Sequence, residues 1–384
     1  MKSKLNKLAC LSIVLFLTIA CTTVKSKKIS IKNTSNLNYE SKVVEIPWKE
    51  IIEQYPKLDS TNFRIIDANS KEEVTFQLEY AGKPMIKNVL VQLSLKANTS
   101  TELQIEEKEP RAFTSKTFGR YVPERLDDFA WENDKIAFRM YGKALELQGK
   151  GNAYGTDVWV KSTDKLVIDE RYKRGKYHED HGDGMDYYHV GFTLGAGNIA
   201  PYKSDSIWYS KNYNQYKVLD NGPLRTSFQL DFEPWSVAGE KVTATKIVSL
   251  DAGTQLNKIT VSYVYEDEEI MPAVIGIIKR AEEGGKELLN TEEGILAYWE
   301  PTYGNDGTTG VGVIIPSKVN DMKVRNDQFL AEVEILNNVP FIYYTGAAWD
   351  KAGVITNNKQ WVSYLETKKQ ELLNSGIVIS FKIE

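Results

Sequence analysis

Cysteine and histidine are scarce in this chain of 384 residues, which has two cysteines and three histidines. Both cysteines, Cys10 and Cys21, lie in an N-terminal stretch with the features of a secretory signal. Cys10 leaves with the signal and Cys21 is expected to be modified, so the mature domain should contain no free thiol and no disulfide. A cysteine nucleophile and a thiolate metal site are therefore excluded.

A basic surface is missing as well. The formal net charge is −4, and removal of the signal with Lys2, Lys4 and Lys7 changes it to −7. Nucleic acids are bound largely through lysines and arginines that contact the phosphate backbone. We therefore expect no nucleic-acid partner.

The first 21 residues predict export. Their lysines precede an apolar run at residues 8–20, which is too short and wrongly flanked for a membrane span. The letters LTIAC at residues 17–21 resemble a bacterial lipobox, in which the cysteine becomes the lipid-bearing first residue. No acidic run follows Cys21, so we expect a lipid anchor in the outer membrane that faces the periplasm. An ordinary cleaved signal is the alternative.

Apolar residues alternate with polar ones through much of the chain, which predicts strands with one buried face. Such segments include residues 74–79, 89–95, 226–232 and 259–265. Helical spacing is limited to short segments that begin at Trp48 and near Trp361, the second followed by a final strand. We therefore expect a mostly β fold: a linker at residues 22–44 and one large β-sandwich domain at residues 45–384, with few short helices.

All three histidines lie within the fifteen residues KYHEDHGDGMDYYHV, residues 176–190. Histidine titrates near neutral pH and is a common metal ligand. Because the chain uses histidine nowhere else, this segment is its predicted chemical centre. A solvated polar loop is the alternative interpretation.

A second segment, residues 119–145, is dense in charged and aromatic residues. Arg120 and Arg125 stand out because a planar guanidinium matches a carboxylate or sulfate in two-point geometry. Weak surface ion pairs and buried Arg–Asp pairs are the structural alternatives.

Aromatic residues are plentiful, with eight Trp, 21 Tyr and 13 Phe. Tyr and Trp suit surfaces that are apolar on one side and wet on the other. The faces of sugar rings are such surfaces, although core packing also uses many of these rings.

Five motifs carry a resemblance to a known family. They are PERLDDFAWENDKIAFRMYG, GTDVWVKST, KYHEDHGDGMDYYHVG, LDNGPLRTSFQL and YYTGAAWDKAG, which begin at residues 123, 155, 176, 219 and 343. From about residue 45 onward the chain resembles a family of Gram-negative lipoproteins, filed as a domain of unknown function, that includes the ulvan-oligosaccharide dehydratases of polysaccharide utilization systems.

The resemblance implies a fold and a reaction. The fold is a sandwich related to the aldose-epimerase and polysaccharide-lyase superfamily. The reaction is loss of water from a uronic acid at the non-reducing end of an acidic, ulvan-type oligosaccharide, which gives an unsaturated uronate. The acidic oligosaccharide would then be the partner, with membrane contact through the lipid anchor only.

Elimination of this kind needs a cation that neutralises the carboxylate, a base for the proton on the neighbouring carbon and a donor for the leaving hydroxyl. The base candidates are His178 and His181, and the donor candidates are Tyr177, Tyr187 and Tyr188. The substrate-binding candidates are Arg120, Arg125 and Lys161 for the carboxylate, Trp131 and Trp159 for ring stacking, and Asp183 and Asp186. His189 follows at an expected strand start, where a structural role is the simpler interpretation.

Other functions stay open at this point. His178, His181, Asp183 and Asp186 offer nitrogen and oxygen ligands for a divalent cation, although their spacing matches no established metal loop. A glycoside hydrolase would need a carboxylate pair, for which Asp127, Asp128, Glu132, Asp183 and Asp186 are available. A chain-cleaving polysaccharide lyase and a non-catalytic sugar-binding lipoprotein are the remaining alternatives.

Overall fold

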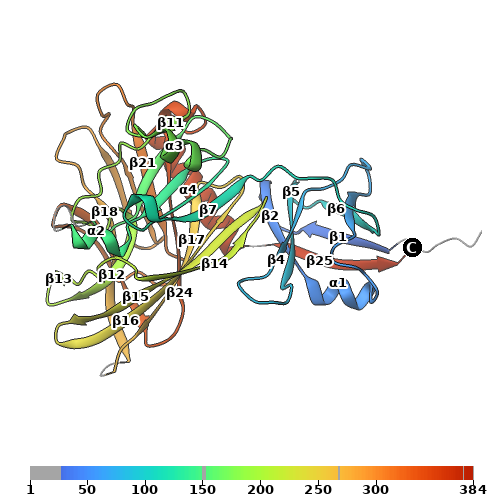
Figure 1. Cartoon of the computed structure of the whole chain (residues 1–384), viewed down its shortest axis with the longest axis horizontal. Helices are drawn as coiled ribbons and strands as arrows, with labels where there is room; N and C mark the ends of the chain where they lie inside the picture. Colours follow the sequence, from blue (N-terminus) through green and yellow to red (C-terminus); the bar gives the residue numbers. More distant parts are fainter. Residues whose placement is uncertain (1–26, 149–152, 267–268, 375, 384) are drawn as a thin grey trace, which may run out of the picture.

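The computed structural model describes residues 27–148, 153–266, 269–374 and 376–383. Strands dominate these residues and the helices are few, so the predicted mostly β fold is confirmed. The strands gather in a smaller and a larger lobe that lie side by side (Figure 1). Among the described residues, no helix combines the length and apolar character needed to cross a bilayer. Cys21 and the rest of the predicted signal lie outside the described residues.

Two sheets face each other in the smaller lobe. One has the order β25-β1-β6-β3 and the other the order β2-β5-β4. Their strands are β1 (Lys27–Asn33), β2 (Tyr39–Pro47), β3 (Arg64–Asp67), β4 (Phe76–Glu79), β5 (Asn88–Leu95), β6 (Ser100–Glu106) and β25 (Ile377–Ile383), with helix α1 (Trp48–Gln54) after β2. A separate hydrophobic core lies between them.

This lobe corrects two expectations. Residues 27–44, expected to be a linker, form β1 and most of β2, because Ile29 and Ile31 alternate into the core of the smaller lobe. The described chain also has two main hydrophobic cores in place of one continuous sandwich. The periodicity of the smaller lobe resembles that of the larger one, so the pattern alone did not separate them.

Three sheets build the larger lobe. An eight-stranded sheet has the order β14-β15-β16-β17-β24-β21-β20-β19, and two five-stranded sheets have the orders β11-β10-β9-β8-β7 and β13-β12-β18-β23-β22. The strands of the first five-stranded sheet are β7 (Thr117–Val122), β8 (Asp128–Asn133), β9 (Ala137–Met140), β10 (Asp157–Lys161) and β11 (Gly184–Met185). Those of the second are β12 (Ala196–Lys203), β13 (Ser206–Ile207), β18 (Ile270–Ile278), β22 (Asp321–Arg325) and β23 (Gln328–Leu336).

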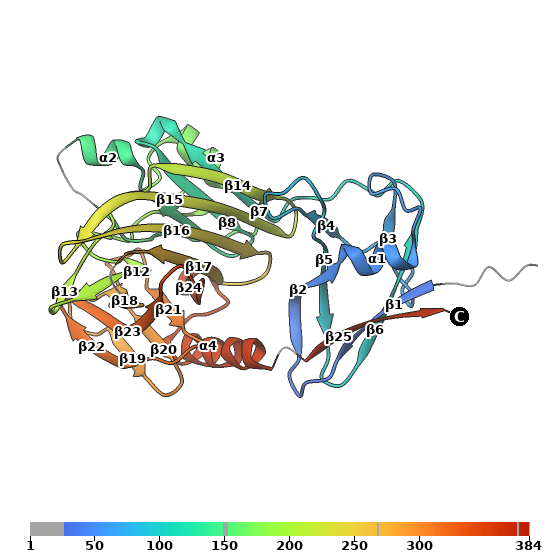
Figure 2. The ribbon, with the colours of Figure 1, turned by 90° about the horizontal axis from the view of Figure 1, so that it is seen from below.

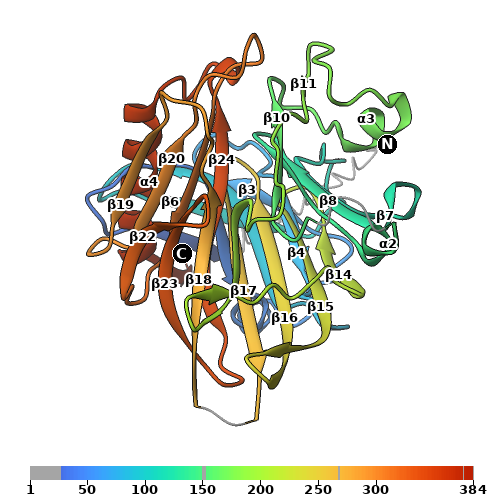
Figure 3. The same ribbon diagram turned by 90° about the vertical axis from the view of Figure 1, so that its left-hand side faces the viewer.

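The eight-stranded sheet covers both five-stranded sheets. Its strands are β14 (Gln215–Asn221), β15 (Arg225–Val237), β16 (Glu240–Asp251), β17 (Leu256–Val264), β19 (Lys286–Asn290), β20 (Ile295–Trp299), β21 (Thr309–Ile314) and β24 (Phe341–Trp349). One core unites all three sheets, which makes the lobe a sandwich whose second layer has two parts. Figure 3 shows β8 and β18, one from each part, on opposite sides of the lobe.

Helices pack mainly around the sandwich. The longest, α4 (Asn358–Leu373), covers the outer face of the eight-stranded sheet and buries Trp361 and Leu365 there. It ends beside the smaller lobe, where the chain crosses to β25 (Figure 2). The predicted helices near Trp48 and Trp361 are thus confirmed, as is the final strand. The shorter α2 (Lys143–Leu147) and α3 (Ile168–Arg174) had no clear sequence pattern.

The chain passes from one five-stranded sheet to the other between β11 and β12. This connection, residues 186–195, contains the end of the histidine segment. The fold therefore places the predicted chemical centre where the two parts of the second layer meet.

Candidate active site

A cavity of about 670 Å³ opens where the two five-stranded sheets meet. Its walls come from the turn after β7, from β9, from α2 and from the connection after β11. The lining residues are Arg125, Arg139, Tyr141, Leu145, Ala153, His178, Asp186, Tyr187, Tyr188, His189, Val190, Gly191 and Phe192. Nearly half of them belong to the segment singled out by its histidines.

Local interactions fix the loop that carries these histidines. Gly184 has φ +92°, and a Cβ there would lie 2.2 Å from the carbonyl oxygen of Val160, so only glycine fits beside β10. The Asp180 carboxylate accepts hydrogen bonds from the backbone N–H groups of Gly182 and Gly184, at 2.8 and 2.9 Å. The acidic residue thus serves the turn, as in other Asx-stabilised loops.

His178 faces the cavity with a defined tautomer. Its Nδ1 lies 2.7 Å from the backbone carbonyl oxygen of Asp186. A carbonyl only accepts hydrogen bonds, so Nδ1 carries the proton and Nε2 presents its lone pair. The side chain is 65% exposed, and the Asp186 carboxylate lies 3.6 Å from Nδ1. The Asp186 side chain thus lies beside the imidazole, and burial raises the pKa of its carboxyl.

Arg125 provides a cation at the same cavity. Its Nε donates a hydrogen bond of 2.9 Å to the hydroxyl of Tyr177, whose ring stacks on Trp159. Arg125 forms no salt bridge with any carboxylate of the described residues. The rest of its guanidinium is thus available to a ligand.

A buried ionic cluster lies beneath these groups. Arg139 contacts Asp157 at 2.6 Å, Asp186 at 3.0 Å and Asp128 at 3.7 Å. Burial raises the pKa of Asp128 to about 7, although Arg139 opposes the shift. Burial and the neighbouring Asp186 raise the pKa of Asp157 to about 7 as well. One guanidinium does not neutralise three carboxylates, so protons are held here near neutral pH.

Two tyrosines complete the cavity. The Tyr188 ring is buried, and its hydroxyl has no hydrogen-bond partner among the described residues. Burial raises the pKa of this hydroxyl well above its ordinary value, so it keeps its proton. The guanidinium of Arg280 lies 4.6 Å from the ring centroid. Tyr187 instead bonds its hydroxyl to Thr309 Oγ1 at 2.6 Å.

Several predicted site residues are parts of the core. Trp131 is buried and donates a hydrogen bond to Asn257, and Trp159 is buried behind Tyr177. Neither ring can stack against a sugar in the cavity. Lys161 is also buried, and its ammonium pairs with the buried carboxylate of Glu132 at 2.6 Å. The structure thus places these three predicted substrate-binding residues in the core and outside the lining of the cavity.

Other predicted residues lie outside the cavity. Arg120 pairs with Glu124 and Asp169, each at 2.6 Å. Asp183 accepts from Arg174 at 3.2 Å. His181 lies 3.9 Å from the carboxylate of Glu179 and does not line the cavity. The structure therefore separates Arg120, Asp183 and His181 from His178. Tyr177 does not line the cavity, but it contacts two residues that do, Arg125 through its hydroxyl and His178 through its ring at 4.6 Å.

The arrangement of acidic residues bears on two alternatives, a metal site and a glycoside hydrolase. No three His, Cys, Asp or Glu residues of the described chain are arranged to hold a metal ion. Of the carboxylates considered for hydrolysis, Asp127 bonds to the hydroxyl of Tyr121 and Glu132 pairs with Lys161. Asp186 is the one acidic residue that lines the cavity. Two carboxylates facing each other across it are thus absent from its described lining.

Three polar residues near the cavity were missed by sequence reasoning. Arg280 lies beyond the end of β18, and Glu300 and Tyr303 follow β20. Arg280 reaches the histidine segment across 91 positions of sequence, through a hydrogen bond to the carbonyl oxygen of His189. The available signal was a polar turn, EPTYGNDG at residues 300–307, directly after a buried strand.

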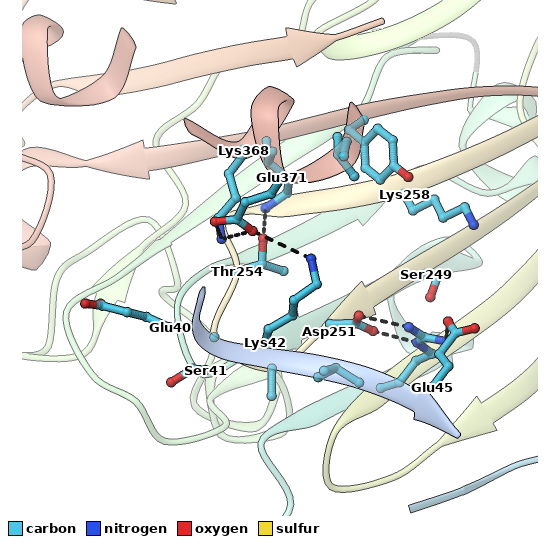
Figure 4. Close-up of a pocket in the computed structure, with 17 residues that line it drawn as sticks. Glu40, Ser41, Lys42, Glu45, Ser249, Asp251, Thr254, Lys258, Lys368 and Glu371 are labelled. Carbon is cyan, nitrogen blue, oxygen red and sulfur yellow. Dashed lines mark hydrogen bonds and ion pairs between the residues drawn. The ribbon is translucent and has the colours of Figure 1, made fainter. Parts of the chain in front are cut away.

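A second cavity, of about 220 Å³, lies between the lobes (Figure 4). Lys42 and Lys368 approach Glu371 there, at 3.8 and 3.0 Å. Arg225 binds Asp251 on the other side of the cavity, at 2.6 Å. These charged groups are paired with one another, which suits a role in joining the lobes more than one in chemistry.

The chain is similar to known proteins in sequence and in fold. A profile of DUF4861, described as a domain of unknown function, matches residues 31–377. Uncharacterized protein P7 of Formosa agariphila is 29% identical over 391 residues, which cover 96% of each protein. A solved structure, a protein in glycosyl hydrolase family 38 from Enterococcus faecalis, aligns over 94% of this chain with a TM-score of 0.51 and 9% identity. This chain covers 47% of that one, and the likeness shows a shared fold alone.

Proposed function

This chain belongs to the DUF4861 family, and from the cavity at its sheet junction we propose that it eliminates water from a terminal uronic acid of an acidic, ulvan-type oligosaccharide. One observation carries the proposal. The free Nε2 of His178 and the guanidinium of Arg125, which has no carboxylate partner among the described residues, face the same cavity. A base beside a cation is the combination that removal of a proton next to a carboxylate requires.

Arg125 binds the uronate carboxylate in this proposal. Neutralising its charge acidifies the proton on the adjacent fifth carbon, because negative charge then develops onto the carboxylate as the proton leaves. The planar guanidinium also fixes the orientation of the group in two-point geometry.

His178 acts as the base. Its Nε2 takes the proton from the fifth carbon, and the bonding electrons form the new double bond to the fourth carbon. The Asp186 carbonyl oxygen at 2.7 Å accepts a hydrogen bond from Nδ1, so Nε2 is the nitrogen that takes the proton.

We assign the proton for the hydroxyl that leaves the fourth carbon as water to Tyr188, which lines the cavity and whose buried hydroxyl has to become accessible when the substrate binds. Its hydroxyl has no protein partner to satisfy among the described residues, and burial keeps it protonated. Arg280, 4.6 Å from the ring, stabilises the phenolate that remains. Transfer of a proton from His178 to Tyr188 through solvent restores both groups.

The sugar class and the location are parts of the same proposal. The solved structure with the shared fold is a protein in glycosyl hydrolase family 38, and we extend only the carbohydrate class from it. Hydrolysis is less favoured than elimination, because the described lining of the cavity has a single carboxylate, that of Asp186. A lipid on Cys21 would hold the enzyme on the periplasmic side of the outer membrane.

Mass spectrometry of a defined uronate tetrasaccharide tests the reaction. We expect loss of one water, with new ultraviolet absorbance and an unbroken chain. His178→Ala should lower turnover at least ~100-fold, the scale of general acid–base catalysis. His181→Ala is the matched control, since it changes the same segment outside the cavity.

Three other outcomes contradict the proposal in different ways. Two fragments with an unsaturated end show a chain-cleaving lyase, and two saturated fragments show a hydrolase. Unchanged masses with several bound uronate saccharides show a non-catalytic binding protein.

A further inference from the structure

A smaller cavity of about 290 Å³ adjoins the candidate active site. It shares Tyr187 and His189 with the larger cavity. Its other lining residues are Ile278, Lys279, Arg280, Ala281, Glu282, Glu300, Pro301, Thr302 and Tyr303. The two cavities therefore lie next to each other, on either side of these two side chains.

An arginine–glutamate pair forms the polar wall. Arg280 Nε donates to Glu300 Oε1 at 2.6 Å, and Arg280 Nη1 donates to the carbonyl oxygen of His189 at 2.6 Å. The Glu300 side chain is 6% exposed and that of Arg280 is 16% exposed. In the described part of the chain, Arg280 Nη2 and Glu300 Oε2 have no hydrogen-bond partner. The pair thus presents one donor and one acceptor.

An exposed aromatic ring, that of Tyr303, also lines this cavity. Tyr303 is 49% exposed, far more than the other tyrosines near the site. It lies 5.9 Å from the ring of Tyr187 at 25°, and 6.0 Å from that of His189 at 66°. Tyr187 and His189 thus support the Tyr303 ring, whose other side is available to an apolar sugar face.

This cavity is lined by two basic and two acidic side chains. Its lining has Lys279 and Arg280 as cations, with Glu282 and Glu300 as potential anions. The larger cavity instead offers Arg125 without a carboxylate partner in the described chain. An anion in the smaller cavity would compete with Glu300 for Arg280. A sugar hydroxyl does not compete, because it can accept from Nη2 and donate to Oε2 together.

We propose that this cavity is the subsite for the second sugar of the substrate, and that this sugar is an uncharged ring held by Tyr303 and by the Arg280–Glu300 pair. The proposal rests on the proposed function for the position of the first ring. It makes the enzyme selective for oligosaccharides over single uronates.

Binding to an inactive enzyme tests the subsite directly. In a His178→Ala background, titration calorimetry would compare three probes: a uronate methyl glycoside, a uronate disaccharide with an uncharged second sugar, and the same disaccharide sulfated on that sugar. We expect the uncharged disaccharide to bind most tightly. Tyr303→Ala should weaken its binding about tenfold, the value of one good aromatic contact, and leave the methyl glycoside unchanged.

Two further variants sharpen the test. Tyr80→Ala changes another exposed tyrosine, in the smaller lobe, and should change no affinity. Glu300→Gln removes the negative partner of Arg280, so it should raise the affinity for the sulfated probe relative to the uncharged one.

The outcomes separate this proposal from the proposed function. Equal binding of the methyl glycoside and the uncharged disaccharide, insensitive to Tyr303→Ala, overturns the subsite even where wild type eliminates water. If the His178→Ala protein with native Tyr303 and Glu300 binds the sulfated probe more tightly than the uncharged one, the proposal of an uncharged second sugar is wrong. Disaccharide binding that depends on Tyr303, without elimination from any uronate, overturns the proposed function and leaves the subsite standing.

Discussion

Two buried arginines of this protein each face three carboxylates, but only one of the two arginines forms hydrogen bonds with all three. Arg225, between the lobes, binds Asp251 through Nε and Nη2 at 2.6 and 2.9 Å, and binds Glu45 and Glu79 through Nη1 at 2.7 Å. Burial opposes ionisation of Glu45, yet the charge of Arg225 lowers its pKa. Every carboxylate of this cluster thus has a hydrogen bond.

Arg139, beneath the candidate active site, is surrounded differently. Its Nη1 and both carboxylate oxygens of Asp128 make no hydrogen bond among the described residues. The backbone N–H of Gly142 approaches Asp128 without reaching hydrogen-bond geometry. Similar charges therefore give a structural clasp in one place and a titratable, incompletely bonded group in the other. Hydrogen-bond geometry, more than composition, distinguishes them.

Removal of the clasp should have the largest effect on stability. Arg225→Met leaves three carboxylates without their cation at the lobe junction, so we expect a loss of about 3–5 kcal/mol in the free energy of unfolding. Urea unfolding followed by circular dichroism measures it. Arg325→Met removes an exposed ion pair with Asp205 and should cost less than about 1 kcal/mol. Equal losses of unfolding free energy in the two variants would show that Arg225 contributes no more to stability than an exposed ion pair.

Arg139→Met should cost less, about 1–3 kcal/mol, and the cost should depend on pH. The folded pKa values of Asp128 and Asp157, about 7, lie above the ordinary value of 3.8. Groups with raised pKa values favour the folded state at low pH, and this contribution is lost as the pH rises through about 7. Without Arg139 the folded pKa values rise further, so the variant should lose more stability at pH 8 than at pH 5. A loss independent of pH would contradict this account.

Asp128→Asn should stabilise the protein slightly. At pH 8 the wild-type carboxylate is ionised in a buried position without a hydrogen bond, and the amide removes this charge, so we expect a gain of about 1 kcal/mol. The gain should shrink toward pH 5, where Asp128 is protonated in the folded state. Asp251→Asn is the control, and it should destabilise because it breaks the two-point contact with Arg225.

The smallest effect is expected at an exposed arginine. Arg120 pairs with Glu124 and Asp169 at the surface, so Arg120→Ala should change stability by less than about 1 kcal/mol. Turnover of a uronate oligosaccharide should stay within a few-fold of wild type. A loss of activity as large as that expected from replacement of Arg125, the proposed ligand of the uronate carboxylate, would return Arg120 to the substrate-binding set.

Periodicity predicted strands well where a single face is buried. In β17, Ile259, Val261 and Tyr263 are buried and the residues between them are half-buried, as the alternation indicates. In β8, by contrast, every residue from Asp128 to Asn133 is buried, because the strand has packing on both faces. No alternation marks such a strand, so the burial of Trp131 and the pairing of Glu132 with Lys161 were not predictable from it.

The candidate site was predictable as far as it is local in sequence. His178, Asp186 and Tyr188 lie within one loop and its continuation, so their clustering in the cavity follows from sequence proximity. Arg280 follows β18 of the other five-stranded sheet and Glu300 follows β20 of the eight-stranded sheet, and no spacing rule connects them to the histidines. The same dense loop also contains Asp180 and Asp183, whose carboxylates serve turns and ion pairs. Composition does not distinguish such structural acids from functional ones.

The pairing of β1 with β25 has a consequence for synthesis of the chain. Residues 27–33 leave the ribosome long before residues 377–383, which form their partner strand β25. Until β25 emerges, one edge of β1 has unpaired N–H and C=O groups, which can recruit other strands. Contacts so distant in sequence also form slowly. The smaller lobe is therefore completed last, and a premature stop near the C terminus exposes an edge at the opposite end of the sequence.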